Sequence, residues 1–251
     1  MKRILSALAA GLLLSTVAAC SSSDEGTKKT TITVFAAASL KGTFTEIGKK
    51  FEAEHKGVTV KFNFAGSSDL VAQLQQGASA DVLATADDAT MKKSIDDDLV
   101  AVLDKLGTNT LEIATLPANP ANVDSLDDLA DPDVKVVVCA PEVPCGAAAR
   151  DVEKAAGADI KPVSEEQSVT DVLGKVISGE ADAGLVYVTD VKAAGDHVHG
   201  VPFPESAKAV NNYPIAVLSH GTHQATAGDF MDFVTGMTGQ SILSSAGFGK
   251  R

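Results

Sequence analysis

Hydrophobic positions along the chain alternate between the two-residue period of strands and the wider spacing of helices. The expected strands are residues 31–35, 58–64, 81–85, 111–116, 135–138, 183–188 and 215–218. The expected helices carry apolar stripes at 40–51, 70–74, 147–156 and 169–177, and two more carry Phe230, Phe233, Met237, Ile242 and Leu243. Helices between successive strands predict parallel pairing with right-handed crossovers, and hence an α/β fold.

The chain is long enough, at 251 residues, for one large domain or two small lobes. Neither an internal repeat nor a low-complexity linker interrupts the alternation of strands and helices. We therefore expect two α/β lobes joined by more than one crossing of the chain, rather than separate domains on a string.

Composition and charge exclude two classes of protein. With 45% hydrophobic residues, the chain is too apolar to be disordered. Its formal net charge of −12 argues against a nucleic-acid-binding protein, which needs cationic contacts to phosphate. Loss of a leader that contains Lys2 and Arg3 leaves −14, so the overall field repels an anionic ligand. Local dipoles would have to bind such a ligand.

The N-terminus has the parts of an export signal. Lys2 and Arg3 precede an apolar run at 4–14, and residues 17–20 read Val-Ala-Ala-Cys. The run is shorter than the roughly 18 residues that a spanning helix needs. The ending resembles a bacterial lipobox; the alternative is an ordinary signal peptide with a cysteine near its end.

We favour the lipobox because a polar stretch follows it. We expect a signal peptide at 1–19, and a lipidated Cys20 with a flexible tether at 20–30. Lipidation would hold the folded domain on the outer side of the cell membrane.

Two further cysteines, Cys139 and Cys145, have five residues between them. The exported compartment permits disulfides, whereas a metal or redox site would need more ligands or a C-x-x-C spacing. We therefore expect a disulfide that holds the shape of a short loop and adds little stability.

Three strand-to-helix turns carry serine. Ser39 begins the first helix, Ser67 and Ser68 begin the second, and Ser168 begins the helix that starts at Val169. Helix N-termini expose unpaired N–H groups and a partial positive charge, so they bind anions. Taken singly, each serine is most simply an N-cap. Three such turns at the carboxyl ends of parallel strands, however, are where open α/β sheets place ligands.

The chain resembles the molybdate-binding proteins of bacterial ABC importers in five segments, which occur in the family's order: Thr-Val-Phe-Ala-Ala-Ala-Ser-Leu (33–40), Phe-Ala-Gly-Ser-Ser-Asp-Leu (64–70), Ala-Asp-Val-Leu-Ala-Thr-Ala-Asp (80–87), Pro-Glu-Val-Pro-Cys-Gly (141–146) and Gly-Leu-Val-Tyr-Val-Thr-Asp (184–190). The resemblance implies a type II periplasmic-binding-protein clamshell, in which each lobe is a mixed, mostly parallel sheet flanked by helices. On this basis we expect lobe 1 at 31–107 plus 213–251 and lobe 2 at 108–212.

The resemblance also implies which residues hold a tetrahedral oxyanion between the lobes. Ser39 and Ser67 would donate from hydroxyl and amide, Val169 from its backbone N–H, and Tyr187 from its phenol. Cys145 would donate its backbone N–H, and it departs from the family, which has alanine there. Molybdenum would be bound only as its oxyanion, with no protein ligand to the metal, no cofactor and no catalysis.

Uncharged donors suit such a ligand. Molybdate and sulfate are fully deprotonated at neutral pH and only accept hydrogen bonds. Phosphate keeps a proton and would gain from a carboxylate acceptor, whereas Asp69, the nearest candidate, is more simply a partner of the helix dipole. Sulfate differs from molybdate mainly in size, which a list of residues does not resolve.

Other patterns are weaker. Tyr187 has the alternative role of a half-buried core aromatic, and Tyr213 is interpreted as a packing or hinge residue, so the paired tyrosines of a ferric site are not expected. The pairs His197/His199 and His220/His223 are common surface patterns rather than metal sites. The sequence lacks the motifs of hydrolases, nucleotide-binding proteins and metalloproteases.

We therefore expect a monomeric extracytoplasmic lipoprotein that captures molybdate and tungstate and delivers them to the permease of an ABC importer. One alternative is another oxyanion such as sulfate. The other is a secreted α/β enzyme with Ser39 or Ser67 as nucleophile, which would need a histidine base near these turns.

Overall fold

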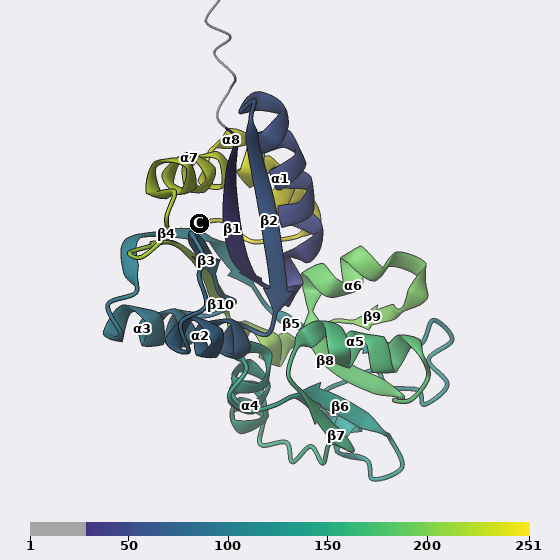
Figure 1. The fold of residues 1–251 in the computed structure, drawn as a ribbon. Helices are drawn as coiled ribbons and strands as arrows, with labels where there is room; N and C mark the ends of the chain where they lie inside the picture. The colour runs from purple at the N-terminus through teal and green to yellow at the C-terminus, as the bar shows by residue number, and fades with distance from the viewer. Residues whose placement is uncertain (1–28) are drawn as a thin grey trace, which may run out of the picture.

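The computed structural model describes residues 29–251, and it consists of two lobes, each built on one five-stranded sheet (Figure 1). The expected signal peptide and Cys20 lie outside the described residues. In the part of the chain that is described, none of the helices has the length and hydropathy of a membrane span.

The first lobe forms around the N-terminal and C-terminal parts of the chain. Its strands, in spatial order, are β2 (Val58–Ala65), β1 (Thr30–Ala37), β3 (Val82–Ala84), β10 (Asn211–Leu218) and β4 (Val100–Asn109). Its helices are α1 (Lys41–Glu54), α2 (Ser67–Gln75), α3 (Asp88–Asp96), α7 (Gln224–Thr235) and α8 (Met237–Ala246), with the 3₁₀ turn η1 (Ala38–Leu40) before α1.

Alternation along β1 explains why helices cover both faces of this sheet. Ile32 and Val34 belong to the core cluster that includes Phe44 of α1 and Phe230 of α7. Phe35, the residue after Val34, points to the other face and joins the cluster of α2 and α3. Both faces are therefore buried, as the apolar run of β1 predicts.

The second lobe contains the middle of the chain. Its strands, in spatial order, are β7 (Ser164–Glu166), β6 (Val136–Cys139), β8 (Ala183–Tyr187), β5 (Leu111–Thr115) and β9 (His199–Val201). Its helices are α4 (Pro144–Ala156), α5 (Val169–Ile177) and α6 (Val188–Ala194), with the 3₁₀ turns η2 (Asp127–Ala130), η3 (Gly195–His197) and η4 (Pro204–Lys208).

Both sheets are mixed, as expected, but parallel pairs make up half of each rather than most. In the first sheet β1 is parallel to β2 and β3, whereas β10 is antiparallel to β3 and β4. In the second, β6 is parallel to β7 and β8, whereas β5 is antiparallel to β8 and β9. Every antiparallel pair includes β5 or β10, the strands at which the chain enters the second lobe and returns to the first.

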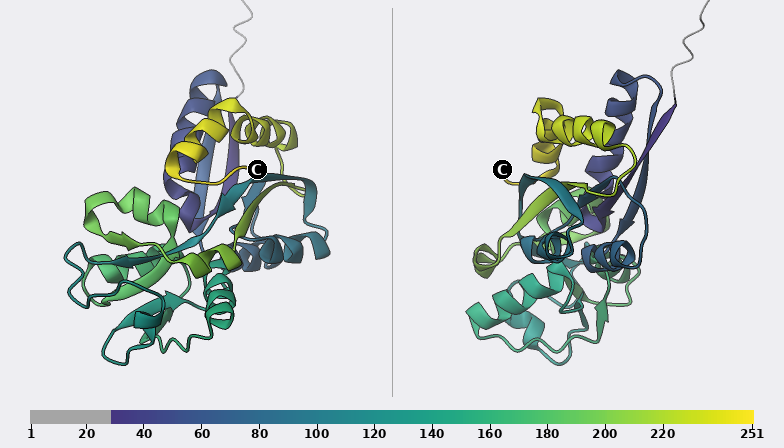
Figure 2. Two further views of the ribbon diagram at one scale, coloured as in Figure 1. Left: turned by 180° about the vertical axis from the view of Figure 1, so that it is seen from behind. Right: turned by 60° about the vertical axis from the view of Figure 1, so that its left-hand side comes forward.

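The chain passes between the lobes twice. It leaves the first sheet after Asn109, enters the second at Leu111, and returns to the first at Asn211 (Figures 1 and 2). Both asparagine side chains are buried and bonded: Asn109 Nδ2 donates to Thr189 Oγ1 at 2.7 Å, and Asn211 Nδ2 donates to the Ala86 carbonyl at 2.8 Å. These crossings place the carboxyl ends of strands from both sheets against each other.

Several of the expected elements are corrected, and the short elements β7, β9 and α6 were not expected. The strand β4 and the helix α3 were not predicted, and β10 begins at Asn211 rather than Ile215. Pro214 is tolerated inside β10 because the register with β4 shifts at Tyr213/Pro214. The helix α4 begins at Pro144 instead of Ala147, since proline suits the first helical turn. The strand β8 ends at Tyr187, and Val188 already belongs to α6.

Candidate functional site

A small cavity lies where the two lobes meet, and all five predicted ligand-binding residues line it. Each of them follows a strand: Ser39 follows β1, Ser67 follows β2, Cys145 follows β6, Val169 follows β7, and Tyr187 ends β8. Two come from the first lobe and three from the second. The cavity measures about 10 Å³, which is close to the least space that holds one water molecule, so it admits only a compact group.

The lining of this cavity carries no charged side chain. Its members are small, apolar or hydroxyl residues: Ala37, Ala38, Ser39, Gly66, Ser67, Ala86, Val143, Pro144, Cys145, Val169 and Tyr187. No histidine is among them, so neither Ser39 nor Ser67 has the base that the enzyme alternative requires. The cavity offers hydrogen-bond donors without a fixed countercharge.

Ser67 is the first residue of α2 and is almost completely buried. Its Oγ accepts a hydrogen bond from the backbone N–H of Ala86 at 3.0 Å. Because the oxygen accepts there, the hydroxyl hydrogen remains free to donate to a group in the cavity. The Ser67 N–H has no acceptor within its helix either, since first-turn amides never do.

The N-cap interpretation of the serines holds for Ser168 but not for the other two. Ser168 Oγ accepts from the N–H of Asp171 at 3.3 Å and caps α5. In contrast, the N-cap of α2 is Gly66, and Ser39 Oγ contacts Tyr213 Oη at 3.0 Å. The hydroxyls of Ser39 and Ser67 therefore do not cap the N-termini of their own helices.

Two residues of the second lobe that line the cavity, Val169 and Cys145, have backbone amides without a partner in their own helices. Val169 is the first residue of α5, and Cys145 is the second residue of α4, so the N–H groups of both lack intrahelical acceptors. Cys145 is joined to Cys139 by a disulfide, with 5.6 Å between their Cα atoms. This bond ties the first turn of α4 to the end of β6 and leaves the Cys145 amide available.

Tyr187 is fully buried, and its hydroxyl has no hydrogen-bond partner among the described residues. A buried hydroxyl without a partner costs free energy, so it indicates a place for an acceptor. Burial raises the pKa of this phenol well above its usual value, which keeps it a donor. Its backbone N–H donates to Asp190 Oδ2 at 3.0 Å, which fixes the residue at the start of α6.

The expectation that the tyrosines are not paired is wrong. Tyr187 and Tyr213, from different lobes, lie edge-to-face with ring centroids 5.8 Å apart. Burial raises the pKa of both phenols, which opposes the phenolate form that a ferric ion requires. In the described residues no cluster of three or more His, Cys, Asp or Glu side chains forms a metal site, and the two histidine pairs contribute none.

The lobes touch directly beside the cavity. A Cβ atom on Gly66 would lie 2.1 Å from the carbonyl oxygen of Gln167, the residue before Ser168. The Ser68 hydroxyl donates to the backbone carbonyl of Glu142 in the second lobe. These two contacts hold the lobes against each other at the edge of the cavity.

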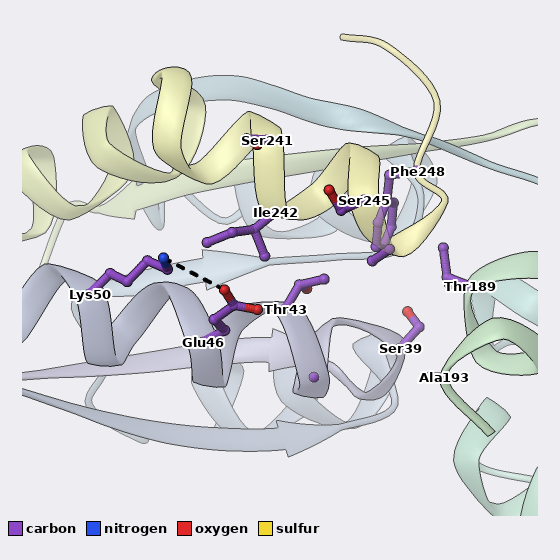
Figure 3. A pocket seen from close by; sticks show the side chains of 12 residues that line it. Ser39, Thr43, Glu46, Lys50, Thr189, Ala193, Ser241, Ile242, Ser245 and Phe248 are labelled. Atoms are coloured by element: carbon purple, nitrogen blue, oxygen red, sulfur yellow. Dashed lines mark ion pairs between the residues drawn. The ribbon is translucent and has the colours of Figure 1, made fainter. Parts of the chain in front are cut away.

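A larger groove of about 420 Å³ lies on the other side of Ser39, between α1, α6 and α8 (Figure 3). It contains the Glu46 carboxylate, which is paired with Lys50 at 3.8 Å, and both of these side chains are about half exposed. A carboxylate repels an anion, and the lining of the narrow cavity carries none. The narrow cavity is therefore the candidate anion site.

Comparison with known proteins identifies the family. Residues 32–249 match the model of a family described as bacterial extracellular solute-binding protein. The chain is 50% identical over 220 residues to the molybdate-binding protein ModA of Mycobacterium tuberculosis strain H37Rv, which covers 87% of this chain and 84% of the relative.

Two solved structures share the fold. The Azotobacter vinelandii periplasmic molybdate-binding protein superposes with a TM-score of 0.75 at 21% identity, covering 88% of this chain and 99% of that one. The sulfate-binding protein SubI of M. tuberculosis reaches the same TM-score of 0.75 at 20% identity, covering 87% and 86%. The chain belongs to the family of bacterial extracellular solute-binding proteins.

Proposed function

We propose that this protein captures molybdate, and tungstate as well, in the cavity between its lobes and delivers it to an importer in the membrane. The observation that carries the proposal is the lining of the cavity. It brings donors from both lobes, no charged side chain, and the buried Tyr187 hydroxyl that has no partner among the described residues.

The chemistry of these donors fits a small oxyanion that carries no proton. The hydroxyls of Ser39, Ser67 and Tyr187 and the amides of Cys145 and Val169 would give five donors from five turns, and the amides of Ser39 and Ser67 would add two more. The helix starts add partial positive charge around the cavity. Such a site neutralises a dianion with dipoles that it does not have to reorganise, so the anion is held and can still be released. Capture in this way needs no resident cofactor.

Delivery follows from the two-lobed fold. An anion that contacts both lobes stabilises the closed arrangement, and a transporter that recognises the closed form binds the loaded protein. The family is extracellular, and lipidation of Cys20 would keep a single copy of the domain near its transporter in the membrane.

Sulfate is the alternative ligand, because it has the same shape and also lacks a proton. The sulfate-binding structure shares the fold as closely as the molybdate-binding one. The likeness in sequence to a molybdate-binding relative favours molybdate for this chain.

The test is a thermal unfolding series with molybdate, tungstate, sulfate and phosphate at equal ionic strength, after unfolding and refolding to remove bound ligand. A ligand at about 1,000 times its Kd adds about 4 kcal/mol to the free energy of unfolding. We expect a large rise in Tm with molybdate and tungstate alone. An equal rise with sulfate would change the ligand, and no rise with any oxyanion would refute the proposal.

A double variant and a matched control test whether molybdate binds in the cavity. Ser39→Ala combined with Ser67→Ala removes two of the proposed donors and should abolish the rise in Tm with molybdate. The matched control is Ser244→Ala, which changes an exposed serine of α8 that lines neither the cavity nor the groove. Undiminished molybdate binding in the double variant would contradict the site.

A further inference from the structure

Tyr213 does not line the cavity, but it contacts a residue that does. It lies on β10 with no exposed surface, and its Oη is 3.0 Å from Ser39 Oγ. Its ring packs edge-to-face against Phe248, with centroids 5.2 Å apart, and against Tyr187. The phenol is therefore held in one place behind Ser39.

The direction of the hydrogen bond between Ser39 and Tyr213 matters for the cavity. Burial raises the pKa of the Tyr213 phenol, so the hydroxyl keeps its hydrogen. Ser39 Oγ, at 3.0 Å, is the partner of this hydroxyl within hydrogen-bond distance among the described residues, and the Asn109 and Tyr187 side chains are its other polar neighbours. If Ser39 donated to Tyr213, the hydrogen of the phenol would lose this close acceptor and would have to turn to one of those two neighbours.

If Tyr213 donates to Ser39 instead, the hydroxyl hydrogens of both residues are bonded once an acceptor enters the cavity. Tyr213 then donates to Ser39, and Ser39 donates to the ligand, in a chain whose members polarise one another. The Ser39 oxygen, which already accepts from Tyr213, is then a poor acceptor for a hydrogen on the ligand itself. Ser67 Oγ is in the same position, because it accepts from the Ala86 N–H.

We propose that Tyr213 is a positioning residue that fixes the Ser39 hydroxyl as a donor toward the cavity, and that it thereby makes the site prefer oxyanions without a proton over those that carry one. The inference rests on the proposed function, because it concerns how the same cavity selects among oxyanions. It adds a residue that touches no ligand and that the sequence had assigned to packing.

The variant Tyr213→Phe removes the hydroxyl and keeps the ring contacts with Phe248 and Tyr187. The Ser39 hydroxyl can then turn, and it can donate or accept. We expect molybdate to bind about tenfold more weakly, because the Ser39 hydroxyl is then no longer held or polarised as a donor and must be ordered when the ligand binds. Far-UV circular dichroism and the Tm without ligand establish that the variant is folded.

Two anions of matched size distinguish a positioning role of Tyr213 from a general loss of anion affinity. Sulfate and hydrogen phosphate have nearly the same size and charge at mildly alkaline pH, but only hydrogen phosphate carries a proton. The preference for sulfate over phosphate, measured by competition with molybdate, should fall by about tenfold in Tyr213→Phe. A merely structural defect would weaken both anions equally and leave the preference unchanged.

A double-mutant cycle tests whether Tyr213 acts through Ser39. In the Ser39→Ala background the tyrosine has no hydroxyl to orient, so Tyr213→Phe should no longer change the preference between sulfate and phosphate. An equal change in both backgrounds would overturn the inference, as would an unchanged preference in Tyr213→Phe alone.

Tyrosine fluorescence distinguishes failure of this inference from failure of the proposed function. The chain has no tryptophan and two tyrosines, both in this cluster, and in Tyr213→Phe all emission comes from Tyr187. Molybdate should change that emission as Tyr187 donates to it. No response to molybdate in either protein would refute the proposed function; a response with equal affinities and an unchanged preference would refute the role of Tyr213 alone.

Discussion

At the scale of single residues, the polar groups that line the cavity are neutral hydrogen-bond donors, and a buried ionisable carboxyl, that of Asp190 in the first turn of α6, lies outside the lining. Burial raises the pKa of Asp190 to about 7, and the hydrogen bond from the Tyr187 N–H opposes this rise. No cation appears among the groups that shift it. The carboxyl is therefore a place where pH acts on stability close to the site.

We predict that Asp190→Asn makes the protein more stable at high pH. The folded protein holds the Asp190 proton up to about pH 7, whereas the unfolded chain releases it near pH 3.8. The unfolded state thus binds fewer protons within this window, so the free energy of unfolding of the wild type falls as pH rises through it. Asparagine keeps an acceptor for the Tyr187 N–H and carries no charge.

Urea unfolding of both proteins across this range checks the prediction. As pH rises from 3.8 to about 7, the free energy of unfolding of the variant should increase relative to that of the wild type. Above about pH 7 the difference should stay constant, on the order of 1–3 kcal/mol. Parallel stability curves for the two proteins would contradict it.

At the scale of elements, the site is made of helix starts held by their neighbours. The first turn of α4 is the tightest case, because the Cys139–Cys145 bond ties it to β6. A Cβ atom on Gly146 would lie 2.0 Å from the Ala140 carbonyl oxygen, so only glycine fits beside this bond. The position of the Cys145 amide is thus set by a covalent bond and by close backbone packing.

We predict that Cys139→Ala combined with Cys145→Ala preserves the fold and weakens molybdate binding several-fold. The short loop accounts for a loss of about 2 kcal/mol in the free energy of unfolding. The Cys145 amide remains but is less fixed, so ordering it costs part of the binding energy. Calorimetric titration with molybdate measures the effect. The reduced wild type, with both thiols counted, should behave like the variant, and unaltered affinity after full reduction would refute the prediction.

At the scale of the whole molecule, ligand capture depends on how the lobes meet. The contact of Gly66 with Gln167 and the hydrogen bond from Ser68 to Glu142 join the lobes next to the cavity. The two crossings at Asn109 and Asn211 leave the lobes able to rotate about short segments. Closure of the lobes therefore requires the backbones at Gly66 and Gln167 to meet with no side chain between them.

We predict that Gly66→Ala blocks closure while each lobe stays folded. Gly66 has φ −56° and ψ 140°, which alanine adopts readily, so the first lobe itself tolerates the change. The added Cβ would lie 2.1 Å from the Gln167 carbonyl oxygen, so the lobes must separate. Molybdate binding should weaken by more than about tenfold, because part of the ligand's contacts is lost.

Small-angle scattering and calorimetry together check this prediction. With molybdate, the wild type should become more compact, and Gly66→Ala should remain open. The matched control is Gly228→Ala in α7, where an added Cβ meets no atom within 4 Å. A variant that closes and binds like the control would contradict the proposed role of this contact.

Local features could be predicted because they depend on neighbours along the chain. The apolar periods marked most strands and helices, and small hydroxyl residues after strands marked the start of α2 and α5. The strand β4 was missed, since none of its first six residues is buried and its alternation is weak. The five predicted ligand residues came from a family resemblance, and their positions in sequence say nothing about the distances between them.

What the sequence by itself determined was the set of elements, the small and uncharged residues at their ends, and the class of solute-binding protein. Only the tertiary structure decided that five turns from two lobes surround one compact cavity, and that Ser39 contacts Tyr213 across 174 positions of the chain. It also decided that Ser168 is a cap while Ser39 and Ser67 are not. The physical reason is that a hydrogen bond takes its direction from the partner, and these partners are brought together only when the two lobes pack.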